Sequence, residues 1–291
     1  SVSAPEEDPW RVAARRIAAA VRRGERIGIF GDYDTDGITS AAVLRLALSR
    51  YTDNLCVRLP VRQVGYGLLE PYVRDLFADG VRLLVTADCG VSNRGEVELA
   101  ASLGMDVIVT DHHIPPQELP AAAVAVLDPK VWDPEDPLAG VGVAWKLAWA
   151  VARELEGPGA RRWLGGLLDL VSVGTVVDIA PLVGDNRVLA FAGLKHLNRA
   201  LSGGRARPGL EALARVAGLR GAVDEEDLGW RIGPRINSIG RLKDPGPALD
   251  LLLTSDRREA LRIASLLNQL NAERQRRTEQ AVARALEEVD P

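Results

Sequence analysis

The chain has 291 residues, of which 47% are hydrophobic and 26% are charged. A chain of this length can bury a sizeable core, which excludes a small disulfide-stabilised scaffold. No stretch approaches the roughly 20 uninterrupted apolar residues of a membrane span, and we find no secretory signal. Since the chain also has only two cysteines, Cys56 and Cys89, we expect a soluble protein of the cytoplasm.

The charge balance gives a mixed indication of the binding partner. The formal net charge is −4, whereas proteins that bind nucleic acid are often basic. However, arginine supplies 32 of the 36 cationic side chains, and its planar guanidinium suits bidentate binding of phosphate. A GC-rich genome would produce the same excess of arginine, so composition alone leaves both explanations open.

Short apolar runs alternate with segments of helical periodicity in the first half of the chain. The predicted strands cover residues 26–30, 55–59, 82–87, 106–110 and 123–127, and the predicted helices cover 11–23, 38–50, 71–78 and 94–103. This alternation is typical of βαβ units. The sequence therefore predicts an α/β fold, with a parallel sheet of five to six strands and helices on both faces.

The pattern becomes helical from about residue 140. Helices are predicted over 141–154, 161–173, 187–201, 209–217 and 247–253, and a last one runs from about 256 to the end. At over thirty residues it exceeds the usual 8–20 residues, so we interpret it as a helix connecting to a second lobe that this chain lacks; a helix packed back along the sheet is the alternative. The predicted parts are an α/β part (1–139), a helical part of the same domain (140–254) and the connecting helix (255–291).

Polar residues with metal-binding chemistry follow three of the predicted strands. These residues are Asp32, Asp34 and Asp36 in GDYDTDG, Asp88 in TADCG, and His112 and His113 in VIVTDHHIPP. The carboxyl ends of parallel strands meet at one edge of a sheet, where ligands bind. Carboxylates crowded there repel one another unless cations are present, and carboxylate with imidazole favours Mn²⁺ or Mg²⁺ over thiolate-bound zinc. With four or more carboxylates, two metal ions are expected.

Asp178 is a further candidate ligand because it lies within the apolar segment VGTVVDIAPL. A buried carboxylate needs a partner, and a metal ion would serve. The alternative is that Asp178 caps a helix.

Together these motifs resemble a known family. DYDTDG (32–37), TADCG (86–90), DHH (111–113) and VGTVVDIAPL (173–182) look like the four successive motifs of the DHH phosphoesterase superfamily. Their order and spelling are similar to the RecJ branch, which contains single-strand-specific 5′-to-3′ exonucleases. Two further RecJ-like segments are LPVRQVGYGL (59–68) and GPRINSIGRL (233–242).

The resemblance implies a set of metal ligands. Asp34, Asp36, Asp88, His112 and Asp178 would bind two Mn²⁺ or Mg²⁺ ions, with Asp88 bridging the pair. In related pyrophosphatases a histidine precedes the first carboxylate of the D-x-D pair by four residues, whereas this chain has Phe30 in that position. We expect Asp32 or water to replace the missing ligand.

The resemblance also implies roles in substrate binding and catalysis. His113 is expected to face the scissile phosphate, where it would donate to a phosphate oxygen or protonate the leaving oxygen; a second metal ligand or a packing role is the alternative. Arg62, Arg235, Asn237 and Arg241 are expected to contact the substrate, since the glycines of GPRINSIGR would let the backbone approach a ligand closely. Tyr66 could stack on a base.

The function implied by the resemblance is hydrolysis of single-stranded DNA from the 5′ end, releasing 5′-mononucleotides in DNA repair and recombination. A single-strand DNA-binding protein and a helicase are the implied partners, and a monomer is expected. One alternative is a family member acting on short oligoribonucleotides, 3′-phosphoadenosine 5′-phosphate or cyclic dinucleotides. Another is a non-catalytic scaffold, which the ligand-competent residues at all five implied positions disfavour.

Overall fold

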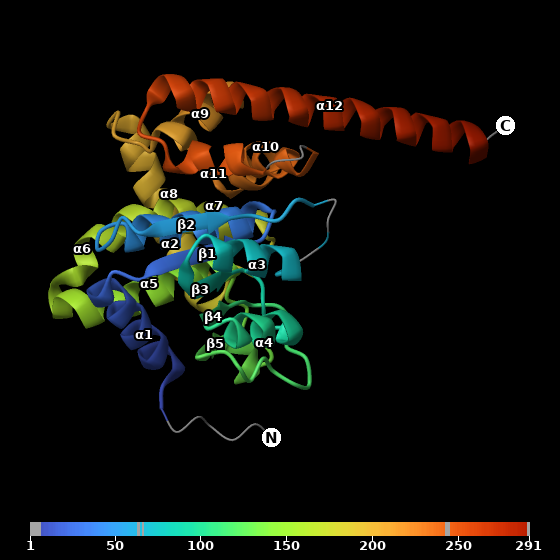
Figure 1. The fold of residues 1–291 in the computed structure, drawn as a ribbon. Helices are drawn as coiled ribbons and strands as arrows, with labels where there is room; N and C mark the ends of the chain where they lie inside the picture. Colours follow the sequence, from blue (N-terminus) through green and yellow to red (C-terminus); the bar gives the residue numbers. More distant parts are fainter. Residues whose placement is uncertain (1–6, 63–64, 66, 242–244, 290–291) are drawn as a thin grey trace.

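The computed structural model describes residues 7–62, 65, 67–241 and 245–289. Strands and helices alternate in the first half, and the second half is helical, as the sequence predicted (Figure 1). The first half contains α1 (Pro9–Arg23), β1 (Arg26–Gly31), α2 (Thr35–Leu48), β2 (Leu55–Arg58), α3 (Glu70–Ala78), β3 (Val81–Ala87), α4 (Arg94–Ser102), β4 (Asp106–Thr110) and β5 (Ala125–Leu127). The principal helices of the second half are α5 (Gly140–Glu156), α6 (Arg161–Leu164), α7 (Leu168–Val177), α8 (Gly184–Ser202), α9 (Pro208–Val216), α10 (Gly233–Asn237), α11 (Gly246–Leu253) and α12 (Arg257–Val289).

The five strands form one parallel sheet in the order β2-β1-β3-β4-β5. All five predicted strands are confirmed, each within two residues of its predicted bounds. β1 pairs on both sides, with Phe30 opposite Arg58 of β2 and Thr86 of β3. A strand that is paired on both sides and covered on both faces has a nearly continuous run of apolar residues. This explains why the sequence RIGIF was enough to predict β1.

Each face of the sheet has its own apolar core. Ile27 and Ile29 of β1 pack into a large cluster with residues of α1, α2, α5 and α7. Phe30 belongs to the smaller cluster on the opposite face, which includes residues of α3 and α4. Because successive side chains of a strand alternate between faces, one apolar strand contributes to both clusters.

Polar residues and glycines define the ends of the first helix. The Asp8 carboxylate accepts the N–H of Trp10, which satisfies one free donor at the start of α1. The helix ends at Gly24, whose φ of +65° suits a residue without Cβ. These local signals lie within the sequence itself, so the predicted helix was nearly correct.

The second half differs from the prediction in two places. The single helix predicted over 161–173 is divided into α6, a 3₁₀ turn η3 (Gly165–Leu167) and α7, and the break falls at Gly165 and Gly166, which favour helix poorly. The glycines of GPRINSIGR predicted a segment that admits a ligand to its backbone. Instead it forms α10 and the 3₁₀ turn η5 (Ser238–Arg241), preceded by the π-helix η4 (Asp227–Ile232).

Helix packing explains the first glycine of that segment. A Cβ on Gly233 would approach both Cγ atoms of Val177 to 2.5 Å, so glycine lets α10 lie directly against α7. Gly233 thus has a packing role, and the approach of a ligand to the backbone of GPRINSIGR stays a prediction.

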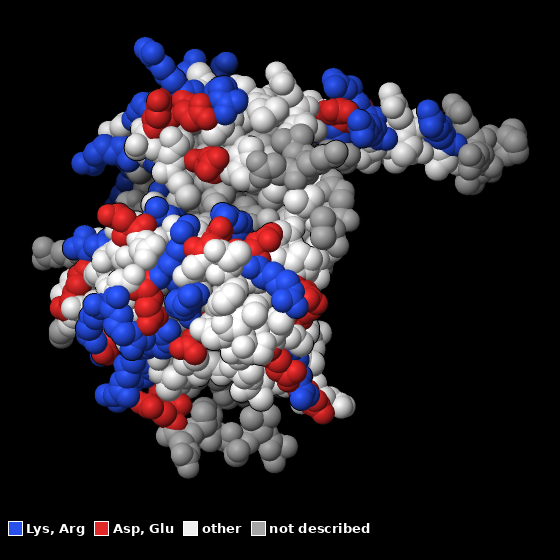
Figure 2. Space-filling model, in the orientation of Figure 1, with Lys and Arg blue, Asp and Glu red and all other residues white. Residues whose placement is uncertain are grey.

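α12 has two distinct parts. Its first half packs on α9, α10 and α11 and buries Ala260, Ile263, Ala264 and Leu267. Residues 275–286 are all exposed, and this part extends away from the body of the molecule (Figures 1 and 2). The alternative of a helix packed back along the sheet is therefore wrong for this part. Among the described residues, no helix combines the length and apolar character needed to cross a membrane.

Candidate metal centre

Hydrogen bonds of the sheet continue past the strand ends and bring three aspartates into register. The backbone N–H of Asp32 donates to Ala87 (3.1 Å), that of Asp88 to Thr110 (3.0 Å), and that of Asp111 to Leu127 (3.1 Å). Asp32, Asp88 and Asp111 thus directly follow β1, β3 and β4 at the carboxyl edge of the sheet. The sequence predicted this meeting of polar residues, and the structure confirms it.

Asp34 and Asp36 are positioned by helix termini. The Asp34 side chain caps α2 by accepting the N–H of Gly37 at 3.0 Å. Asp36 accepts two N–H groups from the start of α5, one from Gly140 (2.8 Å) and one from Val141 (2.9 Å). The N-terminus of a helix favours negative charge, so the start of α5 holds the Asp36 carboxylate in place at this edge of the sheet.

Two glycines make room for these carboxylates. A Cβ on Gly140 would lie 2.5 Å from Asp88 Oδ1 and 2.9 Å from Asp36 Oδ2. A Cβ on Gly174 of α7 would lie 2.9 Å from Asp36 Oδ1. Any larger residue at these positions would displace the carboxylates.

Seven of the predicted site residues converge. Within the described chain, three sets have ligand atoms within 4.8 Å of one another: Asp32, Asp34 and Asp88; Asp36, His112 and Asp178; and Asp88, His112 and His113. His112 Nε2 lies 3.1 Å from Asp88 Oδ1, 3.7 Å from Asp36 Oδ2 and 3.9 Å from Asp178 Oδ2. Asp88 and His112 each belong to two sets, and of these two only Asp88 is a carboxylate, whose two oxygens could bind two ions.

Several of these atoms are buried without a hydrogen-bond partner. Asp32 Oδ1, Asp88 Oδ1 and His112 Nε2 are inaccessible to solvent and form no hydrogen bond within the described residues, although the last two atoms lie 3.1 Å apart. Leaving a buried polar atom unsatisfied costs about 1–3 kcal/mol, so such atoms call for an explanation. Carboxylate oxygens and an imidazole nitrogen are the ligands that Mn²⁺ and Mg²⁺ take, and the residues present fit a pair of divalent cations.

The pKa values reflect the same arrangement. Burial raises the pKa of Asp32 to about 7, and the charge of Asp34 adds to the effect. Burial also raises the pKa of Asp178 to about 6 and that of Asp88 well above its usual value. Burial lowers the pKa of His112 to about 4, so its imidazole is neutral near pH 7, as a metal ligand must be.

His113 is held differently from His112. Its Nδ1 lies 2.7 Å from Asp111 Oδ1, and this hydrogen bond raises the pKa of His113 despite partial burial. Asp111 also accepts the N–H of Val91 at 2.9 Å. Burial opposes ionisation of Asp111, but the hydrogen bond with His113 keeps its pKa below the usual value. Asp111 therefore orients the His113 ring and favours its protonated form.

The backbone is strained beside the ligands. Among the described residues, Asp88 (φ +65°) and Ile179 (φ +60°) are the non-glycine residues with positive φ. This conformation is costly, above all for a β-branched residue such as Ile179, which directly follows Asp178. Strain at one proposed ligand and directly beside another is typical of a functional site whose geometry the surrounding structure imposes.

Phe30 is buried on the opposite face of the sheet, with its ring 5.2 Å from that of Tyr72. It contributes no ligand, as the sequence indicated. Asp32 has an unpartnered oxygen and shares a set with Asp34 and Asp88, so it is placed to supply the replacement.

The predicted substrate contacts are brought together only in part. Arg62 lies over the Tyr33 ring at 5.4 Å and beside Gly240, so it borders the DYDTDG segment. The Asn237 amide oxygen accepts the backbone N–H (2.8 Å) and hydroxyl (2.7 Å) of Thr35, which gives it a structural task.

Arg235 turns towards α12, where its Nε donates to Asn268 Oδ1 at 3.0 Å. Arg241 ends η5, but its side chain lies outside what the structure describes, and Tyr66 lies outside the described residues altogether.

Sequence reasoning assigned no role to two buried aspartates that lie at this edge of the sheet. Asp111 was visible as the first letter of DHH, but only the histidines were assigned roles. Asp128, which follows β5, is buried with one unpartnered oxygen, and burial raises its pKa to about 7. The two N–H groups that hold Asp36 come from backbone about a hundred residues away, and no side-chain pattern signals them.

Comparison with known proteins agrees with this geometry. Residues 26–175 match the family model described as "DHH family, N-terminal domain". The chain is 39% identical over 282 residues to the single-stranded-DNA-specific exonuclease RecJ of Bacillus subtilis, covering 96% of this chain and 34% of that protein. It is 41% identical over 285 residues to the protein of the same description from Escherichia coli, covering 91% and 48%.

A crystal structure of exonuclease RecJ bound to manganese superposes with a TM-score of 0.84 at 35% identity, covering 98% of this chain and 71% of that one. The chain spans a third to a half of the length of the two bacterial relatives. Because the family model matches more than half of the residues, and includes the strands whose ends carry the aspartates and His112, the chain belongs to the DHH family.

Proposed function

We propose that the chain is the catalytic part of a metal-dependent exonuclease that hydrolyses single-stranded DNA from its 5′ end and releases 5′-mononucleotides. The observation that carries the proposal is the convergence of carboxylates and His112 around buried, unpartnered ligand atoms. The similarity to exonucleases described as specific for single-stranded DNA supports the substrate class. Such an activity would serve DNA repair and recombination.

The centre would hold two divalent ions, Mn²⁺ or Mg²⁺. The proposed ligands are Asp34, Asp36, Asp88, His112 and Asp178, with Asp32 in addition. When bound, the ions supply an activated water and stabilise the charge that develops on the attacked phosphate.

The chain's own groups orient the reaction. α5 holds the Asp36 carboxylate through two N–H groups, and Asp111 holds the His113 ring. A protonated His113 would donate a hydrogen bond to a non-bridging phosphate oxygen or a proton to the leaving oxygen. Arg62, beside the DYDTDG segment, would bind a flanking phosphate, and Arg235 and Arg241 are proposed for the same task.

The remaining predictions concern the cellular setting. A single-strand DNA-binding protein and a helicase as partners, a monomeric state, the cytoplasm as location and the division at residues 139 and 254 stay predictions. The core that includes α5 and α7 also includes the sheet, in accord with one domain spanning the first two parts.

The proposal is tested by release of label from a 5′-labelled single-stranded oligonucleotide in Mn²⁺, beside 3′-labelled and duplex forms. We expect mononucleotide release from the 5′-labelled single strand. Asp88→Ala should abolish it, whereas Asp75→Ala, at an exposed position of α3, should not.

Calorimetric titration with Mn²⁺ separates the possible failures. Cleavage of short RNA in preference to DNA would favour a small-substrate member of the family. Binding of Mn²⁺ without any cleavage would contradict the proposal that this chain suffices for catalysis. Absence of Mn²⁺ binding would refute the metal centre itself.

A further inference from the structure

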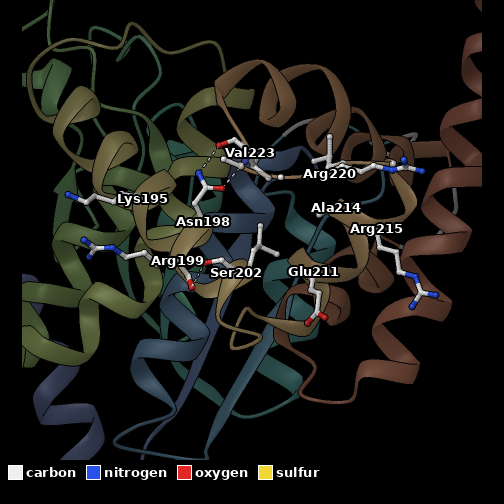
Figure 3. Close-up of a pocket in the computed structure, with 14 residues that line it drawn as sticks. Lys195, Asn198, Arg199, Ser202, Glu211, Ala214, Arg215, Arg220 and Val223 are labelled. Atoms are coloured by element: carbon white, nitrogen blue, oxygen red, sulfur yellow. Dashed lines mark hydrogen bonds between the residues drawn. The ribbon is translucent and has the colours of Figure 1, made fainter.

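A second feature of the molecule is a pocket between α8, α9 and the segment that follows α9 (Figure 3). Its volume is about 1040 Å³. Ligand pockets usually measure about 300–1,000 Å³, so this one could admit several residues of a peptide.

The wall of the pocket is held by a reciprocal pair of hydrogen bonds. Asn198 of α8 donates to the backbone oxygen of Val223 and accepts its N–H, both at 2.7 Å. Between α9 and Val223 the chain turns at Gly218 (φ +70°) and Gly221 (φ +90°). The segment 218–223 is therefore fixed to α8 and forms a defined boundary.

Four cationic side chains border the pocket. Lys195 and Arg199 extend from α8 on one side, and Arg215 and Arg220 extend on the other (Figure 3). All four are exposed, and no ion pair of the described chain involves any of them. The four side chains extend outward from the rim of the pocket, and no ion pair of the described chain neutralises their charge.

The anion that lines the pocket is already neutralised. Both carboxylate oxygens of Glu211 accept from Arg257 Nη1, at 2.7 and 2.6 Å. Glu211 consequently offers little compensation to the four cations. The pocket therefore favours an anionic ligand.

Between the charged sides the lining is largely apolar, with Leu201, Ala214, Leu219 and Val223. The described lining has no aromatic side chain. Proteins that bind single-stranded nucleic acid without sequence preference stack the bases on aromatic rings, and this pocket offers none. A peptide segment with acidic side chains at both ends and apolar side chains between them matches the lining of the pocket better than single-stranded nucleic acid does.

The pocket is separate from the metal centre. Asn198 lies about 21 Å along α8 from Gly184, at 1.5 Å per residue, whereas Asp178 precedes the start of that helix. A ligand in the pocket would therefore leave the metal centre accessible.

We propose that this pocket is a docking site for an acidic segment of a partner protein, whose carboxylates pair with the cations on the two sides and whose apolar side chain lies on the floor. Arginine forks on both sides would bind carboxylates in bidentate geometry. The attraction would steer the partner and weaken with salt.

The test is fluorescence anisotropy of the complete 291-residue chain with a labelled peptide, Glu-Asp-Glu-Leu-Asp-Leu-Glu-Asp. Arg199→Glu and Arg215→Glu, on opposite sides, should each weaken binding at least about tenfold, as expected for loss of a charge-assisted pair and introduction of repulsion. Arg22→Glu in α1, an exposed arginine without an ion pair in the described chain, should leave binding unchanged. Asp88→Ala should bind the peptide normally, which keeps this test independent of the nuclease activity.

Three outcomes would overturn the proposal. The first is no binding of the peptide, and the second is equal weakening by Arg22→Glu. The third is displacement of the peptide by an oligothymidylate whose own binding is weakened by the same two pocket variants, which would make the pocket a nucleic-acid site. Circular dichroism of each variant serves as the test of folding, and the arginine variants should fold normally because the substituted side chains are exposed.

Discussion

Without bound metal, the buried carboxylates of the candidate metal centre should lower the free energy of unfolding. The substitution Asp32→Asn should restore part of it. Asp32 is 2% exposed, and one of its oxygens has no partner in the described chain. Raising its pKa from 3.8 to about 7 makes ionisation in the folded chain about 4 kcal/mol less favourable than in the unfolded chain. Asparagine has a similar shape and no charge.

The pH dependence follows from the direction of this shift. Below about pH 4 the carboxyl is protonated in both states, and the folded chain retains its full stability. As pH rises from about 4 to about 7, the unfolded chain releases this proton while the folded chain still retains it, so stability falls over this range and levels off above it. The advantage of Asp32→Asn should grow from about 1.5 kcal/mol at pH 5 to about 4 kcal/mol at pH 8.

Urea denaturation in EDTA at pH 5 and pH 8 measures this difference. Added Mn²⁺ should reverse the order at pH 8, because binding to the folded chain stabilises the wild type more than a variant with a ligand removed. Asp75→Asn, at an exposed position, is the control and should show no such dependence. A stability difference equal at the two pH values, or an Asp32→Asn variant less stable than wild type at pH 8 in EDTA, would refute the reasoning.

Three further substitutions test the construction of the centre. Gly140→Ala should lower Mn²⁺ affinity and reduce cleavage roughly a hundredfold by displacing carboxylates, whereas Gly95→Ala, whose added Cβ would meet no atom within 4 Å, should not; equal activity of both would contradict the close fit. Asn237→Ala removes two hydrogen bonds to Thr35, so it should lower the free energy of unfolding by about 1 kcal/mol and weaken Mn²⁺ binding. A raised KM with unchanged Mn²⁺ binding would instead identify Asn237 as a substrate contact. His113→Ala should lower kcat about 10²–10⁴-fold with Mn²⁺ binding retained, and loss of calorimetric Mn²⁺ binding would make His113 a ligand.

The sheet and its ligand-bearing edge could be predicted because their signals are local. The segment RIGIF is almost entirely apolar because β1 is covered on both faces. The meeting of the polar residues that follow each strand could be predicted because parallel strands end at one edge of the sheet. Asp32, Asp88 and His112 were therefore found from their position in the chain. Asp178 was a candidate because a carboxylate in an apolar segment needs a partner.

The remaining features depend on contacts between distant segments. Thr35 and Asn237 are bonded across 202 positions, and no local pattern signals such a pair. The glycine of GPRIN favours a loop on propensity alone, but packing of α10 on Val177 overrides that preference. Sequence reasoning thus identified ligands but not the groups that hold them.

The outer part of α12 has a consequence for local stability. Residues 275–286 are exposed throughout, and helices shorter than about 12–15 residues are marginal in water without tertiary packing. The inner part is anchored by Ile263 and Leu267, which are buried. Backbone amides of 275–286 should therefore exchange with deuterium through frequent local opening, while those near Leu267 should exchange only through much rarer opening. Hydrogen exchange along this one continuous helix would thus give two different free energies of local opening. The change between them should fall where α12 leaves the body of the protein, just before residue 275.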